Sequence, residues 1–347
     1  MTKMMSYRNA LVTAVTSEME ADPNVFVFGL DVPDHKRIFG STAGLVEKFG
    51  SKRCFGTPLS EEAMTGIALG AAMSGLKPIH VHIRSDFMLL ATNQIINMVS
   101  NVRYLSGGRL SVPLVIRAII GRGWGQGAQH SKSLHSLFAH IPGLKVVMPS
   151  TPQDAYSLLR AAIQDPNPVI FLEQRWLYDI EGPVDLNLNE KLGHAAVKKE
   201  GKDVTIISTS WMTVEALKVA EVLNKKQGID AEIIDARSIA PLDEKTIYKS
   251  VRKTGRAVVL DYDWVYCGFA SEIAASISEH CFDVLKKPVL RFGFEHVPCP
   301  TTRPLENLFF PAAPKVIRAI ENMFRKAPSD FKDEYFFSYD NKFKGPF

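Results

Sequence analysis

The first half of the chain alternates short apolar runs with longer helical patterns. Runs rich in valine, isoleucine and phenylalanine occupy residues 24–29, 78–82, 112–118, 144–148 and 169–173. Such runs are typical of strands that are buried on both faces of a sheet. Helical patterns occupy residues 63–74, 87–104, 130–140 and 154–164. This order predicts a largely parallel sheet with helices on both faces, which is a doubly wound α/β domain.

The pattern is interrupted by a polar stretch at 179–203 that contains Gly182-Pro183, and then it resumes. The second half predicts strands at 204–208, 230–235, 256–261 and 289–292, with helices at 214–226, 244–253, 270–281 and 314–323. We therefore expect an α/β domain over 1–185, a linker over 186–202 and a smaller α/β domain over 203–325. The remaining residues, 326–347, form an aromatic-rich tail that either packs on its own subunit or binds a partner.

The composition excludes several classes of protein. The 347 residues, 46% of them hydrophobic, are ordinary for a globular enzyme subunit. The net charge of +4 is small and dispersed, so no nucleic-acid partner is expected. No apolar run is long enough to span a membrane, and the first residues lack the apolar core of a signal peptide. The four cysteines lack metal-type or redox-type spacing, which favours free thiols, a reducing compartment and a cytoplasmic location.

The segment Gly56–Met64 combines a turn with a helix start that carries two acids. Pro58 suits a turn or a helix entry, and Ser60 is a good N-cap residue. Glu61 and Glu62 would then lie in the first turn, where the helix dipole favours negative charge. The helix that follows is rich in Gly and Ala, which permits the close helix approach found at subunit interfaces. From residue types alone, these acids either stabilise the helix or carry out proton chemistry.

Several motifs resemble, in the same order, the β subunit of the thiamine-diphosphate-dependent, decarboxylating component of 2-oxo acid dehydrogenase complexes (pyruvate, branched-chain and acetoin). They are Gly56–Glu61, Gly66–Ala72, Asp86-Phe87, Asn93–Asn97, Ala128–Ser131, His140–Val147, Asn167–Glu173 and Ala236–Asp243. The resemblance covers residues 7 to 324. It implies a transketolase-like pyrimidine-binding domain followed by a transketolase C-terminal-like domain.

The resemblance also implies roles for individual residues. Glu61 resembles the carboxylic acid that shares a proton with N1′ of the cofactor's aminopyrimidine, and Phe87 the aromatic residue that stacks on that ring. Leu59 is implied as a further cofactor contact, and His130 as a proton donor or hydrogen-bond partner of the substrate. Glu62 is rotated about 100° around the helix from its neighbour and should not take part. The alternatives are that Glu61 only stabilises the helix, that Phe87 is a core residue and that His130 is structural.

The glycine-rich segment 121–127 is not a dinucleotide-binding fingerprint. The third glycine of G-x-G-x-x-G would fall on Gln126, and no acidic residue ends a following strand at the required distance. We interpret the segment as an active-site loop whose glycines let the backbone approach a ligand or partner. Arg122 and Trp124 are its side chains that can reach a substrate or partner.

A turn near residue 165 resembles a family loop whose backbone carbonyls hold a monovalent cation, here expected to be K⁺. The implied ligands are the carbonyls of Leu114, Ala162, Ile163, Asp165 and Asn167. The alternative is an ordinary helix-to-strand turn, which Asp-Pro-Asn forms equally well.

The chain has no Gly-Asp-Gly…Asn motif for diphosphate and Mg²⁺, which the family places on a separate α subunit. The resemblance thus implies an α₂β₂ heterotetramer with a β–β contact, a small 2-oxo acid as substrate and a lipoyl acyltransferase as acyl acceptor. Three departures suggest a different substrate or partner. Leu30 replaces a usually acidic residue, Arg84 precedes Phe87, and the loop with Arg122 and Trp124 and the long aromatic tail are both unusual for the family. Arg84 either recognises an anionic substrate group, contacts the α subunit or pairs with Asp86.

Two alternative functions stay open on the sequence. The first is ketol transfer or acyloin formation with the same cofactor in a specialised biosynthetic pathway. The second is a non-catalytic paralogue that only binds a partner subunit.

Overall fold

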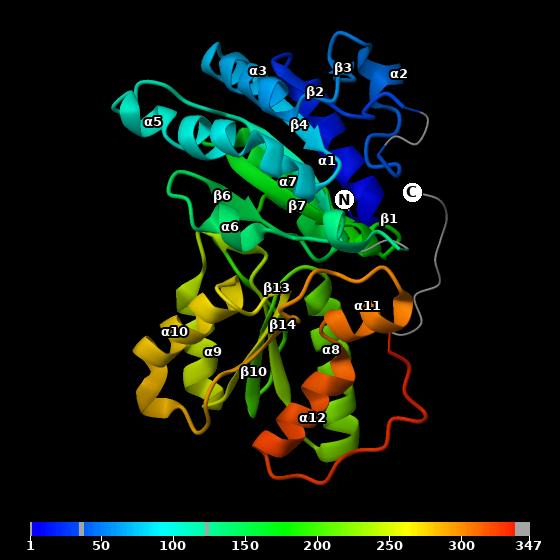
Figure 1. The fold of residues 1–347 in the computed structure, drawn as a ribbon, viewed down its shortest axis with the longest axis vertical. Helices are drawn as coiled ribbons and strands as arrows, with labels where there is room; N and C mark the ends of the chain where they lie inside the picture. The colour runs from blue at the N-terminus through cyan, green and yellow to red at the C-terminus, as the bar shows by residue number, and fades with distance from the viewer. Residues whose placement is uncertain (1, 35–37, 122–124, 337–347) are drawn as a thin grey trace. The chain divides into compact units, whose positions relative to one another are not determined.

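The computed structural model describes residues 2–34, 38–121 and 125–336, and these form two compact α/β units (Figure 1). Among the described residues, the first unit comprises 2–34, 38–121, 133–193 and 238–241, and the second comprises 125–132, 194–237 and 242–336. The predicted class, two α/β domains in series, is confirmed. Two short segments cross between the units: residues 125–132 belong to the second unit although the chain around them belongs to the first, and residues 238–241 belong to the first although the chain around them belongs to the second.

The first unit is built on a largely parallel sheet. In the described residues its spatial order is β12 (Ser238–Ala240), β6 (Lys145–Val147), β7 (Val169–Gln174), β5 (Val115–Ile120), β4 (Lys77–His82), β2 (Val25–Gly29) and β3 (Cys54–Phe55). All neighbours pair in parallel except β12 and β6. Every residue of β5 and β7 is buried, as the apolar runs predict for strands covered on both faces.

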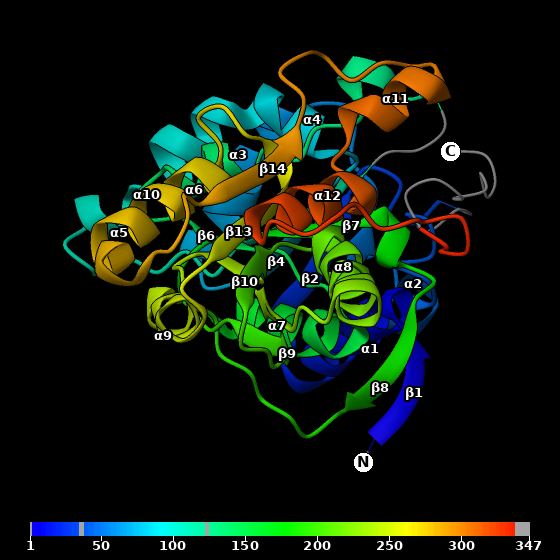
Figure 2. The same ribbon diagram turned by 90° about the horizontal axis from the view of Figure 1, so that it is seen from below.

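Helices and an antiparallel ribbon complete the first unit. The helices are α1 (Tyr7–Ala21), α2 (Leu45–Phe49), α3 (Glu61–Met73), α4 (Ser85–Met88), α5 (Val102–Leu105), α6 (His135–Ala139) and α7 (Pro152–Gln164), with 3₁₀ turns η1 (Leu89–Ala91) and η4 (Arg175–Leu177) and the π-helix η2 (Asn93–Val99). Strand β1 (Thr2–Ser6) pairs with β8 (Glu181–Asp185) beside them (Figure 2). Helix α3 packs on β4, η1 and η2, whereas α1 packs on α7.

The predicted continuous helix over 87–104 is wrong. The structure breaks this segment into α4, η1, η2 and α5. Polar side chains inside it bond to nearby backbone carbonyls: Oγ1 of Thr92 donates to Leu89, and Oγ of Ser100 donates to Ile96. Such bonds compete with the regular helical pattern, so a segment that carries them bends or changes its helix type.

The predicted helix over 130–140 is also too long. Helix α6 begins only at His135, because Leu134 adopts a left-handed conformation with φ of 62° that cannot continue a helix. His130 instead follows the 3₁₀ turn η3 (Gly127–Gln129). The histidine therefore lies in a loop and not at a helix start.

The second unit repeats the α/β pattern on a smaller scale. Over the described residues its sheet order is β14 (Leu290–Phe294), β13 (Ala257–Trp264), β10 (Val204–Ser208), β11 (Ala231–Asp235) and β9 (Ala196–Lys199). Its helices are α8 (Trp211–Gln227), α9 (Glu244–Thr254), α10 (Phe269–Cys281), α11 (Arg303–Phe309) and α12 (Ala313–Met323), with the 3₁₀ turn η5 (Phe282–Val284). Helices α9 and α10 cover one face of this sheet, and α8 and α12 cover the other (Figures 1 and 2).

The edge strand of the second unit comes from the expected linker, and the last described residues of the unit come from the aromatic-rich tail. Strand β9 lies within the expected linker and pairs antiparallel with β11. The described part of the tail packs on its own unit: Phe336 is buried and meets Phe331 edge to face, and Glu334 pairs with Lys218 and Lys225 of α8. For residues 326–336 the structure therefore supports packing on the chain's own subunit; the expected tail residues 337–347 lie outside the described residues.

One ion pair lies in the centre of the first sheet. Nη2 of Arg117, on β5, donates to both carboxylate oxygens of Glu173, on β7, at 2.9 Å, and neither side chain is exposed to solvent. Burial raises the pKa of the Glu173 carboxyl, and the positive charge of Arg117 counteracts this effect. The Glu173 carboxylate can stay charged inside the sheet only because the Arg117 guanidinium lies beside it.

Candidate functional site

A small pocket opens at the carboxyl ends of three neighbouring strands of the first sheet, β4, β2 and β3. The chain leaves each of these strands here, so the side chains that follow them meet at one edge, where parallel sheets commonly bind ligands. The lining residues are Leu30, Thr57, Pro58, Leu59, Glu61, Met64, His80, Val81, His82, Ile83 and Phe87. Three of the four residues proposed from the sequence for the cofactor and the chemistry, Leu59, Glu61 and Phe87, are thus brought together.

A glycine lets β2 reach this edge. Gly29, the last residue of β2, has φ of 153°, and a Cβ atom there would lie 2.2 Å from the carbonyl oxygen of Val81 on β4. No larger residue fits between the two strands without moving one of them. The next residue, half-buried Leu30, then enters the pocket wall, so the position that the family usually fills with an acid is apolar here.

Helix α3 starts at the first of the two acids. Glu61 is half-buried and lines the pocket, whereas Glu62 is exposed and does not. This difference is the one predicted from their angular separation on the helix. Ser60 occupies the N-cap position, as predicted, although its side chain makes no capping hydrogen bond to the described start of α3. The helix begins through the Ser60 carbonyl, which accepts the N–H of Met64 at 2.9 Å.

The aromatic residue of the pocket follows β4. Phe87 lies on the short helix α4 and is half-buried, and Leu59 is 76% exposed at the pocket edge. A half-exposed phenylalanine and an exposed leucine beside a carboxylate form an apolar surface that can take a flat ring with a polar edge.

Sequence reasoning missed two further pocket residues, His80 and His82. They alternate along β4, so both project from the same face of the sheet, and their rings stack with centroids 4.2 Å apart. Phe28 packs on the His80 ring at 4.6 Å. Burial lowers the pKa of both imidazoles, that of His82 to about 4. A His-x-His pair in an apolar run shortly before Asp86-Phe87 was the signal in the sequence.

The neutral state of His82 has a measurable consequence. The imidazole has an ordinary pKa of 6.5 but about 4 in the fold, so below pH 6.5 the unfolded chain binds a proton that the folded chain does not. Stability should therefore fall as the pH is lowered from 6.5 to 4, by about 3 kcal/mol from this residue. Urea unfolding at several pH values should show this decline to be smaller in His82→Gln than in the wild type. Equal declines in the two proteins would contradict the prediction.

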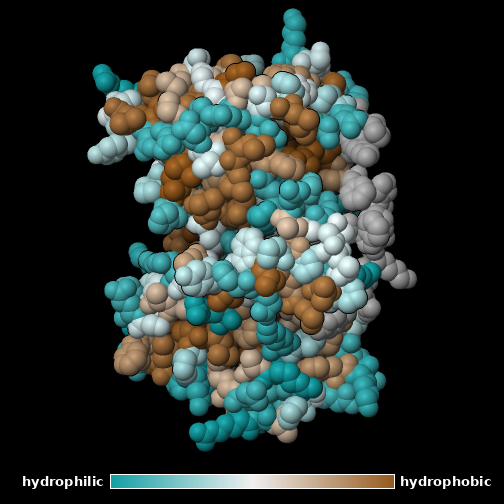
Figure 3. Space-filling model, in the orientation of Figure 1, coloured by the Kyte–Doolittle hydropathy of each residue, from teal (hydrophilic) through white to brown (hydrophobic). Residues whose placement is uncertain are grey.

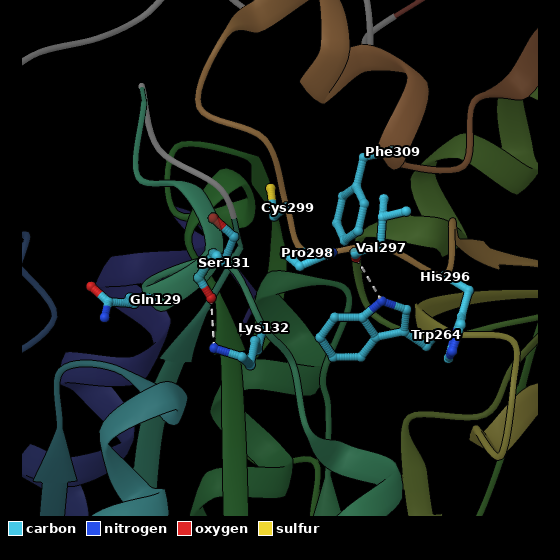
Figure 4. A pocket seen from close by; sticks show the side chains of 10 residues that line it. Gln129, Ser131, Lys132, Trp264, His296, Val297, Pro298, Cys299 and Phe309 are labelled. Carbon is cyan, nitrogen blue, oxygen red and sulfur yellow. Dashed lines mark hydrogen bonds between the residues drawn. The ribbon is translucent and has the colours of Figure 1, made fainter.

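His130 lies in the second unit, on the segment 125–132, and is half-buried. Its neighbours Gln129 and Ser131 line a second cavity of about 460 Å³ within that unit (Figure 4). The other lining residues are Ala128, Lys132, Trp264, His296, Val297, Pro298, Cys299 and Phe309. Nζ of Lys132 donates to the Ala128 carbonyl at 2.6 Å, and Nε1 of Trp264 donates to the Val297 carbonyl at 3.2 Å. The cavity is large enough for a small molecule and is mainly apolar.

The arginine that departs from the family pattern is buried. Nη1 of Arg84 donates to the carbonyl of Gly121, at the end of β5, at 2.7 Å. The side chain thus links the loop after β4 to the loop after β5, and its expected role in substrate or partner recognition stays a prediction. Arg122 and Trp124 lie outside the described residues.

The turn proposed for K⁺ links α7 to β7. The Leu114 carbonyl accepts the N–H of Val169 at 2.9 Å, and the Ala162 carbonyl accepts the N–H of Asp165 at 3.3 Å. The Asp165 carboxylate accepts from both the backbone and the side chain of Asn167, which forms the turn. Each carbonyl has a second lone pair, so these bonds leave the cation site a prediction.

The described part of the chain contains neither a metal-binding cluster nor a membrane-spanning helix. No three His, Cys, Asp or Glu side chains of residues 2–34, 38–121 and 125–336 lie close enough together to hold a metal ion. No helix in the same part of the chain has both the length and the apolar character needed to cross a membrane. The four cysteines are free thiols, as expected.

Two α/β units in series, with a pocket at the strand ends of the first, define a protein of transketolase type. The model of the transketolase pyrimidine-binding domain matches residues 3–180, and that of the transketolase C-terminal domain matches residues 193–316. A solved structure described as a split-gene transketolase, inactive beta4 tetramer, has the same fold: the TM-score is 0.75 at 23% identity, over 92% of this chain and 97% of that one.

Similar proteins of known name show to which family of transketolase-type proteins the chain belongs. The chain is 42% identical over 322 residues to the mitochondrial pyruvate dehydrogenase E1 component subunit beta-1 of Arabidopsis thaliana, covering 91% of this chain and 88% of the relative. It is 40% identical to the 2-oxoisovalerate dehydrogenase subunit beta of Bacillus subtilis and to the acetoin:2,6-dichlorophenolindophenol oxidoreductase subunit beta of Cupriavidus necator, covering 91% and 92% of this chain and 97% of each relative. The chain belongs to the family of E1 β subunits of 2-oxo acid dehydrogenases, and the resemblance inferred from its motifs is confirmed.

Proposed function

We propose that the chain is the β subunit of a thiamine-diphosphate enzyme that decarboxylates a small 2-oxo acid and transfers the acyl group to lipoamide. The observation that carries this proposal is the pocket at the strand ends, where Glu61 and Phe87 lie together. The names of the relatives support the reaction class: they act on pyruvate, on 2-oxoisovalerate or on acetoin.

The pocket residues fit the aminopyrimidine ring of this cofactor. That ring is flat and has a polar edge, so it requires an aromatic or apolar face and a carboxyl group at its edge. Phe87 supplies the aromatic face, Leu59 and Met64 supply apolar contacts, and Glu61 supplies the carboxyl group. The diphosphate and its Mg²⁺ are assigned to the α subunit, because this chain lacks their motif.

When bound, thiamine diphosphate supplies a nucleophilic carbon and accepts the electrons released on loss of CO₂. The chain's own residues set up this chemistry. Glu61 holds and exchanges the proton at N1′ of the pyrimidine ring, and Phe87 orients the ring by stacking. The apolar side chains of Leu30 and Ile83 limit the access of water to that proton. His130 is assigned to the substrate as a proton donor or hydrogen-bond partner.

The partner is proposed to be an α subunit in an α₂β₂ assembly with a β–β contact. Large apolar side chains are exposed on and around α3, η1 and η2: Ile67, Met73, Leu76, Leu89, Leu90 and Met98. Apolar side chains also gather on the face of the first unit that Figure 3 shows. Exposed apolar area of this kind is typical of a subunit interface. The structural relative is described as a beta4 tetramer, which supports contact between two β-type chains.

The finer expectations are proposals of the same kind. We assign K⁺ to the carbonyls around Asp165, a lipoyl acyltransferase as acyl acceptor, and a cytoplasmic location on the basis of the free thiols. The plant relatives, in contrast, are named as mitochondrial proteins. A second candidate function is ketol transfer or acyloin formation, which the apolar Leu30 in the pocket wall favours. The presence of Glu61, Phe87 and His130 argues against a non-catalytic paralogue.

The isolated chain should have no decarboxylase activity and should bind thiamine diphosphate weakly, because it lacks the diphosphate and Mg²⁺ motif. Calorimetry with the cofactor and Mg²⁺ tests this on the chain alone, and co-expression with an α subunit followed by a screen of 2-oxo acids tests the full reaction. Micromolar affinity of the isolated chain would contradict the division of the site. Release of CO₂ without acyl transfer to lipoamide would favour the ketol-transfer function.

A further inference from the structure

Two ring nitrogens on β4, in residues that line the same pocket as Glu61, are buried without a hydrogen-bond partner among the described residues. Nδ1 of His80 and Nε2 of His82 make no hydrogen bond to any of the described residues, although the two side chains are only 2% and 3% exposed. Leaving a buried polar atom unbonded costs about 1–3 kcal/mol, so such atoms indicate a bound group that is not part of the chain. Both histidines line the same pocket as Glu61.

The surroundings keep both imidazoles neutral. The rings stack on each other at an angle of 9°, Phe28 covers His80, and the pocket wall around them is largely apolar. A neutral imidazole offers one N–H donor and one nitrogen acceptor, so each ring can either give or take a hydrogen bond at its free nitrogen. The pair is therefore a hydrogen-bonding surface without charge.

The size of the pocket limits what this surface can bind. The enclosed free space among the lining residues is about 10 Å³, whereas the side of the pocket at Leu59 is open to solvent. One water molecule needs about 10–15 Å³ and two to four polar partners. The Glu61 carboxyl group and the two ring nitrogens are three such partners around the same space.

We propose that Nδ1 of His80 and Nε2 of His82 hold one ordered water molecule that hydrogen-bonds to the Glu61 carboxyl group. The histidines are then positioning residues, because they act on the bound ring through the water and Glu61. This inference rests on the proposed function for its effect on catalysis, but not for the water itself. The inference adds His80 and His82 to the site. Both lie on β4, a strand that the sequence predicts to be buried on both faces.

Isosteric substitutions separate hydrogen bonding from packing. Asn at position 80 keeps a polar atom near the place of Nδ1, and Gln at position 82 keeps one near the place of Nε2, whereas Leu fills either site without one. Ile79→Val, on the same strand, is the control for packing because it changes a buried side chain without changing any polar group. The assembly reconstituted with an α subunit is the protein to test.

A crystal structure of the wild-type assembly should show a water molecule within hydrogen-bond distance of His80 Nδ1, His82 Nε2 and Glu61. His82→Leu should lose this water and lower kcat about 10- to 100-fold, the size expected when a reacting group is misplaced. The KM of the 2-oxo acid and the calorimetric Kd of thiamine diphosphate should change less than threefold, because the water orients the reacting group and does not contribute to binding of either molecule. His82→Gln, His80→Asn and Ile79→Val should keep kcat close to the wild-type value.

The absence of the water, or equal kcat values for His82→Leu and His82→Gln, would overturn the inference. These outcomes differ from a failure of the proposed function. If Glu61→Gln retained full activity, the function assigned to the pocket would be wrong whatever the histidine variants did. If Glu61→Gln were inactive while both His82 variants resembled the wild type, only the water-mediated role would be wrong.

Discussion

Glu61→Gln should lower the turnover of the reconstituted enzyme by about 10²–10⁴, the range for loss of a group that transfers a proton in the rate-determining chemistry. The amide has nearly the shape of the carboxyl group but cannot exchange a proton with the pyrimidine ring. The side chain is half-buried at the start of α3 and lines the pocket, so the substitution removes the acid without leaving a cavity. Steady-state decarboxylation with saturating cofactor measures the effect.

Glu62→Gln is the matched control. This neighbour lies in the same helical turn, carries the same charge and is exposed outside the pocket. Both variants remove one negative charge from the helix N-terminus, so any effect through the helix dipole is common to them. A similar loss of turnover in both would show that the acid stabilises the helix and is not the catalytic group.

Arg117→Met should destabilise the first unit by about 3–5 kcal/mol, because it leaves the Glu173 carboxylate buried without its partner charge. Neither side chain is exposed, and both carboxylate oxygens accept a hydrogen bond from this guanidinium. Urea unfolding of the isolated chain at neutral pH measures the change.

Two controls make this expectation specific. In the double variant Arg117→Met/Glu173→Leu the buried charge is absent, so much of the lost stability should return. Arg252→Met removes a pair of the same length, the 2.9 Å contact between Arg252 and Asp283, but both partners are exposed and the change should be small. If the double variant were as unstable as the single one, the cost would come from packing and not from charge.

Local features of the sequence were enough to locate most strands and the acid of the site. The runs that became β2, β4, β7 and β10 are mainly apolar and largely buried, and burial of this kind shows directly in the sequence. The contrast between Glu61 and Glu62 follows from helix geometry alone, which is local as well. The 87–104 helix failed because side-chain bonds to the backbone outweighed an apolar periodicity.

The sequence by itself therefore determined the α/β class, the order of the main strands and the residues that resemble the family's cofactor site. Only the tertiary structure decided which residues share a pocket, because that depends on strand order: β4, β2 and β3 are neighbours in the sheet, and their loops meet at one edge. It also placed segment 125–132 with the second unit and Ser238–Ala240 with the first. In the sequence, His80 and His82 are only part of an apolar strand, and the sheet brings them to the pocket that Glu61 also lines. The partners of a buried polar atom are set by the packing of segments that are distant in the sequence.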